Sequence, residues 1–188
     1  MEKHGSEGEH NLQEKFGTIN QASIFYKNEV YKLLTSDMQS FISRQEMVFI
    51  ATSDNKGECD CSFRAGSRGF IHIVNEKSLV FPEYRGNGVM ASLGNITENP
   101  HIGMIFIDFF ETTVGLHVNG TARVVEKNEL SEIKSISKSL QENIAATTGR
   151  RPERWILIEV EEAYIHCSKY VPLLKKTEQT GEKNNKVR

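Results

Sequence analysis

The 188-residue chain has no long apolar run, few cysteines and little net charge. No stretch approaches the ~18 consecutive apolar residues of a membrane span, and no apolar region follows the first residues, so we expect no signal peptide. Three cysteines, an odd number in a chain long enough to build a core, argue against a secreted disulfide scaffold. A formal net charge of −2 gives no reason to expect a nucleic-acid partner. These absences predict a cytoplasmic protein that binds neither membranes nor nucleic acids.

Several motifs of catalysis and ligand binding are missing as well. Neither G-x-G-x-x-G nor G-x-x-x-x-G-K-[ST] occurs, which argues against dinucleotide-binding and P-loop folds. The G-x-S-x-G elbow of serine hydrolases is absent too. Cys59, Cys61, His166 and Cys167 lack the spacing of a zinc site, so we predict no metal.

Polarity divides the chain into three parts. Residues 1–20 are polar and lack a sustained apolar period, which predicts a flexible N-terminal arm. Residues 175–188 form a polar basic tail, which is typical of a solvated chain end; contact with an anionic partner is the alternative. The remaining residues, 21–174, have the length of a single folded domain.

Within this domain, runs of strand-forming residues follow one another through short links. The patterns predict strands over 47–52, 58–64, 70–74, 78–81, 101–108, 114–125 and 155–167, with helices over 37–45 and 87–98. A further helix is expected after Asn128, with an apolar stripe at Leu130, Ile133, Ile136, Leu140 and Ile144. Few helices between consecutive strands favour an antiparallel sheet that closes on itself over a parallel one. We therefore predict a mainly β (α+β) fold, a small six- to seven-stranded antiparallel barrel with peripheral helices.

Three polar segments are candidates for a binding site. Residues 81–95 place the loop glycines Gly86 and Gly88, with Arg85 and Ser92, where a strand feeds a helix, which suits a phosphate or another anion, although an ordinary turn with a capped helix is the alternative. Ser62 and Arg64 lie on one side of a predicted strand and form either a polar patch at the barrel mouth or part of an exposed face. His166 and Lys169 are candidates for contacting an anionic or aromatic ligand at a strand end.

Together these segments resemble the FMN-binding split-barrel family that includes the pyridoxamine 5'-phosphate oxidase-like flavoproteins. The most specific parts of the resemblance are the run Ser92-Leu93-Gly94-Asn95-Ile96-Thr97-Glu98-Asn99-Pro100 and the ending His166-Cys167-Ser168-Lys169. The resemblance covers about residues 38–170. It implies a homodimer of split barrels with FMN in a groove at the interface.

The resemblance also implies a role for each candidate residue. Ser62 and Arg64 would meet the flavin phosphate or ribityl chain, and Ser92 and Asn95 would join them. The isoalloxazine or ribityl side would be lined by Pro82, Tyr84 and Asn87, and His166 and Lys169 would approach the ring. The residue types suit these roles, because a phosphate needs an arginine and hydroxyl or amide donors, while a ring needs apolar walls.

The chain also departs from the family. It lacks the Arg- and Trp-containing ending that binds substrate in true pyridoxamine-phosphate oxidases, and their phosphate-gripping basic pair is replaced around Ala91 and Ser92. We therefore predict an FMN-dependent oxidoreductase, not a true pyridoxamine-phosphate oxidase, that transfers a hydride or two electrons at flavin N5 to a small-molecule partner. No residue is compelled to be a general acid or base. The alternative is a non-catalytic dimer that binds flavin or haem for sensing or storage.

Overall fold

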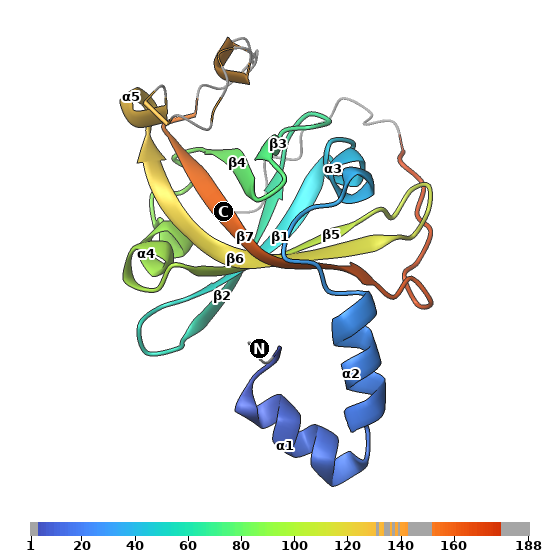
Figure 1. Cartoon of the computed structure of the whole chain (residues 1–188). Helices are drawn as coiled ribbons and strands as arrows, with labels where there is room; N and C mark the ends of the chain where they lie inside the picture. Colours follow the sequence, from blue (N-terminus) through green and yellow to red (C-terminus); the bar gives the residue numbers. More distant parts are fainter. Residues whose placement is uncertain are drawn as a thin grey trace.

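The structure, a computed structural model, describes residues 4–130, 132–133, 136, 138, 140–142 and 152–177 (Figure 1). Its strands are β1 (Met47–Ser53), β2 (Cys59–Ala65), β3 (His72–Asn75), β4 (Ser78–Glu83), β5 (His101–Ile107), β6 (Gly115–Glu126) and β7 (Arg154–His166). Its helices are α1 (Glu7–Phe16), α2 (Ile19–Asn28), α3 (Ser36–Ile42), α4 (Ala91–Glu98) and α5 (Lys127–Leu130).

In these ranges the seven strands form one antiparallel sheet in the order β2-β1-β5-β6-β7-β4-β3. The long strands β6 and β7 run through its middle, and the sheet curls around them, with α4 beside β2 and β6 and α3 at the other end (Figure 1). This curled sheet is the predicted split barrel, and every predicted strand is present. The mainly β prediction is confirmed.

A large apolar cluster fills the inside of the curled sheet. It takes residues from both long strands, such as Leu116 and Ile158, and from the neighbouring β5, whose Phe106 is fully buried. The two helices α3 and α4 add Ile42 and Ile96 to it. Because α3 and α4 each bury an apolar face here, they close the barrel at its two ends.

A second, smaller cluster lies on the outer side of β4, β6 and β7. Val80, Val125, Trp155 and Leu157 form its strand side. From the stripe expected after Asn128, the described residues Leu130, Ile133, Ile136 and Leu140 pack against these strands, as the spacing predicts. The prediction of one continuous helix was wrong, because α5 ends at Leu130 and the described residues Glu132, Ile133 and Ile136 are not helical; Ile144 lies outside the described residues.

The N-terminal region contains two helices for which the apolar pattern gave no signal. Helix α1 begins at an N-cap, Ser6, and ends at Gly17, whose φ of 70° is the left-handed conformation that glycine adopts readily. Tyr26 of α2 donates a hydrogen bond to Glu9 Oε2 (2.6 Å) and so ties α2 to α1. Neither helix buries a residue, so the caps of α1 and the contact between α1 and α2 stabilise them in place of a buried face. The flexibility of this arm relative to the barrel stays a prediction.

The segments that precede and follow the barrel each make hydrogen bonds to it. Tyr31, just after α2, exchanges two backbone hydrogen bonds with Ala163 of β7 (3.0 and 2.8 Å). At the other end, Leu174 N donates to Phe109 O (2.6 Å), and the ammonium group of Lys176 pairs with Glu46 and lies over the Phe110 ring. Residues 174–176 therefore lie against the barrel, and we call this segment the C-terminal strap. Residues 178–188 lie outside the described residues.

Candidate functional site

Three polar side chains alternate along edge strand β2 and share one of its faces. Asp60, Ser62 and Arg64 are partly buried, while the residues between them are exposed. Across the β1–β2 ladder, Ser62 lies opposite Ile50 and Arg64 opposite Val48, both core residues. Since opposite residues in a ladder point to the same side of the sheet, this polar row faces the inside of the curled sheet. The predicted pairing of Ser62 with Arg64 on one face is therefore present.

Helix α4 brings a second serine onto this row. Ser62 Oγ donates to Asp60 Oδ2 (3.0 Å) and Ser92 Oγ donates to the same oxygen (3.2 Å), with the two hydroxyl oxygens 3.1 Å apart. Ser92 is almost completely buried, at 5% exposed. We call Asp60, Ser62 and Ser92 the serine–aspartate cluster.

Arg64 of β2 is paired with a carboxylate of β4, on the inner side of the curled sheet. Its Nε donates to Glu83 Oε2 at 3.0 Å, and both side chains are mostly shielded from water, at 22% and 13% exposed. Glu83 ends β4, which is far from β2 in the order of hydrogen-bonded strands. This ion pair therefore connects two parts of the curled sheet that no backbone hydrogen bond joins.

The other residues predicted around this site are arranged differently. Asn95 of α4 donates through Nδ2 to Thr52 Oγ1 (3.1 Å) and so fixes the helix to β1. Asn87 accepts a hydrogen bond from Val89 N (3.0 Å) and stabilises its own turn. Tyr84 follows β4 directly and is partly buried.

Pro82 does not join the polar row. It is buried in β4 and lies opposite Trp155 of β7, a member of the outer apolar cluster. Since neighbouring residues of a strand point to opposite faces, Glu83 is the one that reaches the inner side and Arg64.

His166, at the end of β7, belongs to a different group of side chains. Its Nδ1 lies 2.9 Å from His117 Nε2, and the His117 ring stacks on Tyr164 with ring centroids 4.6 Å apart and planes 10° apart. Phe25 of α2 touches the Tyr164 ring edge-on, at 5.5 Å between centroids. Lys169 is exposed beyond the strand, with its ammonium group over the Tyr170 ring.

This aromatic group lies on the outer face of the sheet. The register places Phe63, Phe49, Ile105, His117 and Tyr164 in one row across five strands. The residues that alternate with them in β5 and β6, such as Phe106 and Leu116, point into the core. The nine predicted residues therefore do not form one site within a chain, because His166 and the serine–aspartate cluster lie on opposite faces.

Burial of the imidazoles affects how the protein responds to acid. Burial lowers the pKa of His117, and the nearby His166 lowers it further, against an opposing effect of Glu162. Burial also lowers the pKa of His72. Both rings therefore stay neutral to a lower pH than a free imidazole, whose pKa is 6.5. An unfolded chain takes up protons at these positions first.

We therefore expect the protein to lose stability as the pH falls below about 6.5, the value for the unfolded chain. Urea unfolding at a series of pH values should show the free energy of unfolding falling on acidification. Replacing both rings, as His72→Phe with His117→Phe, should make this fall smaller, by at most about 1 kcal/mol, because the rings are partly exposed. An unchanged pH dependence in the double variant would contradict this assignment.

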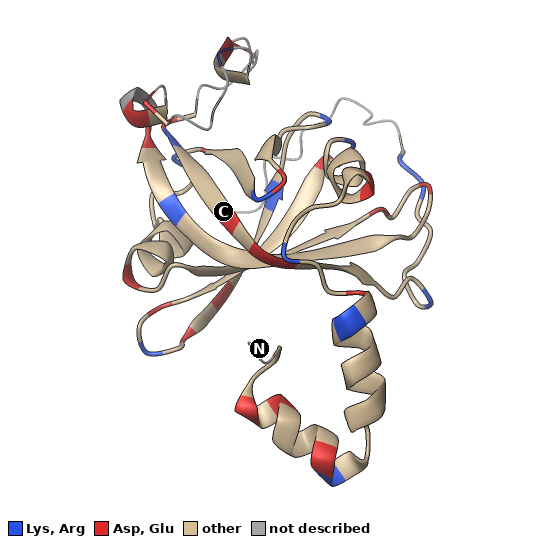
Figure 2. Ribbon diagram, in the orientation of Figure 1, with Lys and Arg blue, Asp and Glu red and all other residues tan. Residues whose placement is uncertain are grey.

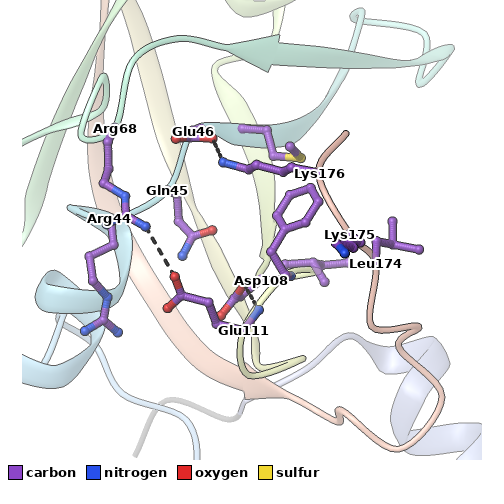
Figure 3. Close-up of a pocket in the computed structure, with 12 residues that line it drawn as sticks. Arg44, Gln45, Glu46, Arg68, Asp108, Glu111, Leu174, Lys175 and Lys176 are labelled. Carbon is purple, nitrogen blue, oxygen red and sulfur yellow. Dashed lines mark hydrogen bonds and ion pairs between the residues drawn. The ribbon is translucent and has the colours of Figure 1, made fainter. Parts of the chain in front are cut away.

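A cavity of about 280 Å³ lies at the strap, away from every predicted site residue. Figure 3 shows its side chains: Arg68 points at Glu111, with 3.4 Å between Nη2 and Oε1, and Lys176 reaches Glu46. These two ion pairs line the cavity, and residues 174–176 form one of its walls. We regard it as part of the packing of the C-terminal strap.

The polar row can be compared with what a flavin phosphate needs. Hydroxyls, an amide and an arginine are the donor types that bind phosphate, and Ser62, Arg64, Ser92 and Asn95 supply them. In this structure, however, both serine hydroxyls lie within hydrogen-bond distance of Asp60 Oδ2 and of each other, and Arg64 Nε donates to Glu83. The donor set thus fits the polyol and ring parts of a flavin and does not fit its phosphate dianion.

Sequence reasoning missed four residues of these two groups. Asp60 could have been found from its alternation with Ser62 and Arg64. Glu83 could have been found from its position next to Pro82, on the other face of the strand. The roles of His117 and Thr52 depend on cross-strand register and helix docking, for which the sequence has no local signal.

Two classes of site are not found in the part of the chain that the structure describes. No group of three or more His, Cys, Asp or Glu side chains lies close enough together to hold a metal ion. The helices described there include none that is long and apolar enough to cross a membrane.

The curled seven-stranded sheet, with α4 at its edge, defines a split-barrel protein. More specifically, the chain belongs to the pyridoxamine 5'-phosphate oxidase family, whose model matches residues 34–167. The resemblance noted from the sequence is thereby confirmed. No curated protein sequence matches the chain.

Solved structures share this fold at low sequence identity. HupZ of Group A Streptococcus is 20% identical, with an alignment over 70% of this chain and 92% of that one and a TM-score of 0.53. HutZ, the heme storage protein from Vibrio cholerae, is 14% identical over 70% of this chain and 94% of its own, with a TM-score of 0.45. Only the fold is carried over from HupZ to this chain.

Proposed function

We propose that this protein is a flavin-dependent oxidoreductase, with the flavin held at the opening of the split barrel between β2 and α4. The observation that carries the proposal is that Ser62 and Arg64 share the inner face of β2 and that Ser92 of α4 lies 3.1 Å from Ser62. Membership of the pyridoxamine 5'-phosphate oxidase family supports it. A bound flavin would accept and donate two electrons at N5. FMN is the cofactor that the sequence predicts, and a small molecule would be the electron donor or acceptor.

The proposed active unit is a homodimer. His166 and Lys169 cannot reach a ligand at the β2–α4 opening of their own chain, because His166 lies on the outer face of the sheet. The outer row also leaves Phe63 52% exposed beside Phe49, an apolar surface that a second copy would cover. In such a dimer, one copy would supply the polar row and its partner the imidazoles. The cytoplasmic location stays a prediction.

The test is the visible spectrum of the purified full-length protein, before and after reconstitution with FMN or riboflavin. We expect a yellow protein whose flavin is bleached by NADH or NADPH without oxygen and recovers its colour when oxygen is admitted. The free flavin with the same donor is the control. A colourless protein that takes up neither flavin would contradict the proposal.

A second candidate is a non-catalytic protein that binds flavin or haem. The observation that favours it is the pair of imidazoles at His117 and His166, since imidazole nitrogen is a common ligand of haem iron. A flavin that binds tightly but exchanges electrons with no donor would support this candidate. So would a haem absorption band that shifts in His166→Ala.

A further inference from the structure

The hydrogen atoms of the serine–aspartate cluster are already committed within the cluster. A hydroxyl has a single hydrogen to donate, and those of Ser62 and Ser92 have their acceptors inside the cluster, at Asp60 Oδ2 or at the other serine oxygen. Their remaining capacity is for accepting hydrogen bonds. A phosphate dianion has only acceptor oxygens, so it cannot use these two hydroxyls while the cluster holds them.

The charged side chains around the serine–aspartate cluster also oppose a phosphate. Asp60 and Glu83 bring two negative charges, and Arg64 brings one positive charge that is paired with Glu83. Figure 2 shows further acidic positions on α4 and around the β1–β2 turn, with a basic position in that turn. A phosphate bound here would lie beside like charges, which repel it most strongly where water is excluded.

The site has little freedom to rearrange around an anion. Ser92 is 5% exposed, and the side chain of Glu83 is 13% exposed. Turning Glu83 away would leave the Arg64 charge partly buried without its partner, which is costly. Turning Asp60 away would leave the buried Ser92 hydroxyl without this acceptor, which is costly as well. The ligand must therefore adapt to the carboxylates.

We propose that the serine–aspartate cluster and the Arg64–Glu83 pair select a neutral polyol and reject a phosphate, so that the protein binds an unphosphorylated flavin at least as well as FMN. The inference rests on the proposed flavin function. A ribityl hydroxyl can donate to Asp60 and accept from a serine or from Arg64, because a hydroxyl does both. The terminal hydroxyl of riboflavin thereby takes the position where the phosphate of FMN would meet Asp60.

Calorimetric titration of the full-length protein with riboflavin and with FMN, at one ionic strength, tests this. In the unmodified protein we expect the dissociation constant for riboflavin to be equal to or below that for FMN. Asp60→Asn keeps the shape and removes the charge, and it should raise FMN affinity by about tenfold while changing riboflavin affinity much less. Glu58→Gln, at an exposed position just before β2, removes the same charge outside the cluster and should leave the ratio unchanged.

Each outcome separates the two proposals. FMN binding far more tightly than riboflavin to the unmodified protein would overturn this inference and leave the flavin function intact. Inorganic phosphate that raises the melting temperature of the unmodified protein, but not that of Arg64→Gln, would also overturn it. Binding of neither flavin would overturn the proposed function and this inference with it. Thermal unfolding of Asp60→Asn shows whether the variant is folded.

Discussion

Replacing Gly120 by alanine is expected to lower the free energy of unfolding by about 3 kcal/mol or more. Gly120 is buried in β6, and a Cβ atom there would lie 2.0 Å from the backbone oxygen of Glu159 in β7. The atom in the way belongs to the main chain, so a rotamer change cannot relieve the overlap. Urea unfolding measures the loss, and failure to recover folded protein would be its extreme form.

The reason for this close approach is a bulge between the two long strands. Asn119 pairs with Glu162 and Gly120 with Val160, so that Glu161 has no partner in β6. The extra residue reverses the alternation along β7 between residues that point into the core and residues that point outward. Ile158 and Val160 point into the core before the bulge, and Ala163 does so after it. The bulge thus turns His166 outward, toward His117.

Gly94 provides the matched control for this substitution. It lies exposed in α4, and a Cβ atom there would have no neighbour within 4 Å. Gly94→Ala should therefore stabilise the protein by about 0.5–1 kcal/mol, the usual gain of alanine over glycine inside a helix. If Gly120→Ala unfolded at the same urea concentration as the unmodified protein, the tight contact between β6 and β7 would be refuted.

Most of the barrel could be predicted from local patterns. Most strands are apolar runs or alternate apolar with polar residues, and the turn at Asn55–Gly57 or the stop at Pro100 can be predicted without knowing what packs nearby. Helix α1 could not be predicted in this way, because it buries no residue and depends on its Ser6 and Gly17 caps. Helix α3 begins at Ser36, one residue before the predicted start at 37, and the Thr35 side chain caps it by accepting a hydrogen bond from Met38 N.

The two halves of the site differ in how far the sequence could predict them. Ser62 and Arg64 are two residues apart in one strand, so their common face follows from the period of a strand. His166 was placed at a strand end correctly, but its face depends on the bulge at Gly120. Continued alternation from Ile158 and Val160 would have put His166 inside the barrel. A one-residue shift in register cannot be predicted from the apolar pattern of the nearby sequence.

The second large effect is expected from Ile96→Ala, which should lower the free energy of unfolding by about 2–4 kcal/mol. Ile96 is 3% exposed in the main core, so its truncation leaves a cavity there. Helix α4 has only eight residues and includes Gly94, and the side chain of its N-cap residue, Met90, makes no capping hydrogen bond. A helix of this kind depends on tertiary packing. Ile96→Val, which removes one methyl group, should cost about 0.5–1.5 kcal/mol.

Because α4 carries Ser92 and Asn95, loosening it should also weaken flavin binding. Leu157→Ala separates this effect from a general loss of stability. Leu157 is buried to a similar degree, at 4% exposed, but lies in the outer cluster on the other side of β7. We expect comparable unfolding energies in the two variants, and a clear fall in flavin affinity, about tenfold, only in Ile96→Ala. Equal flavin affinity in both would mean that α4 does not position the ligand, and the binding site would then have to be sought away from the β2–α4 opening.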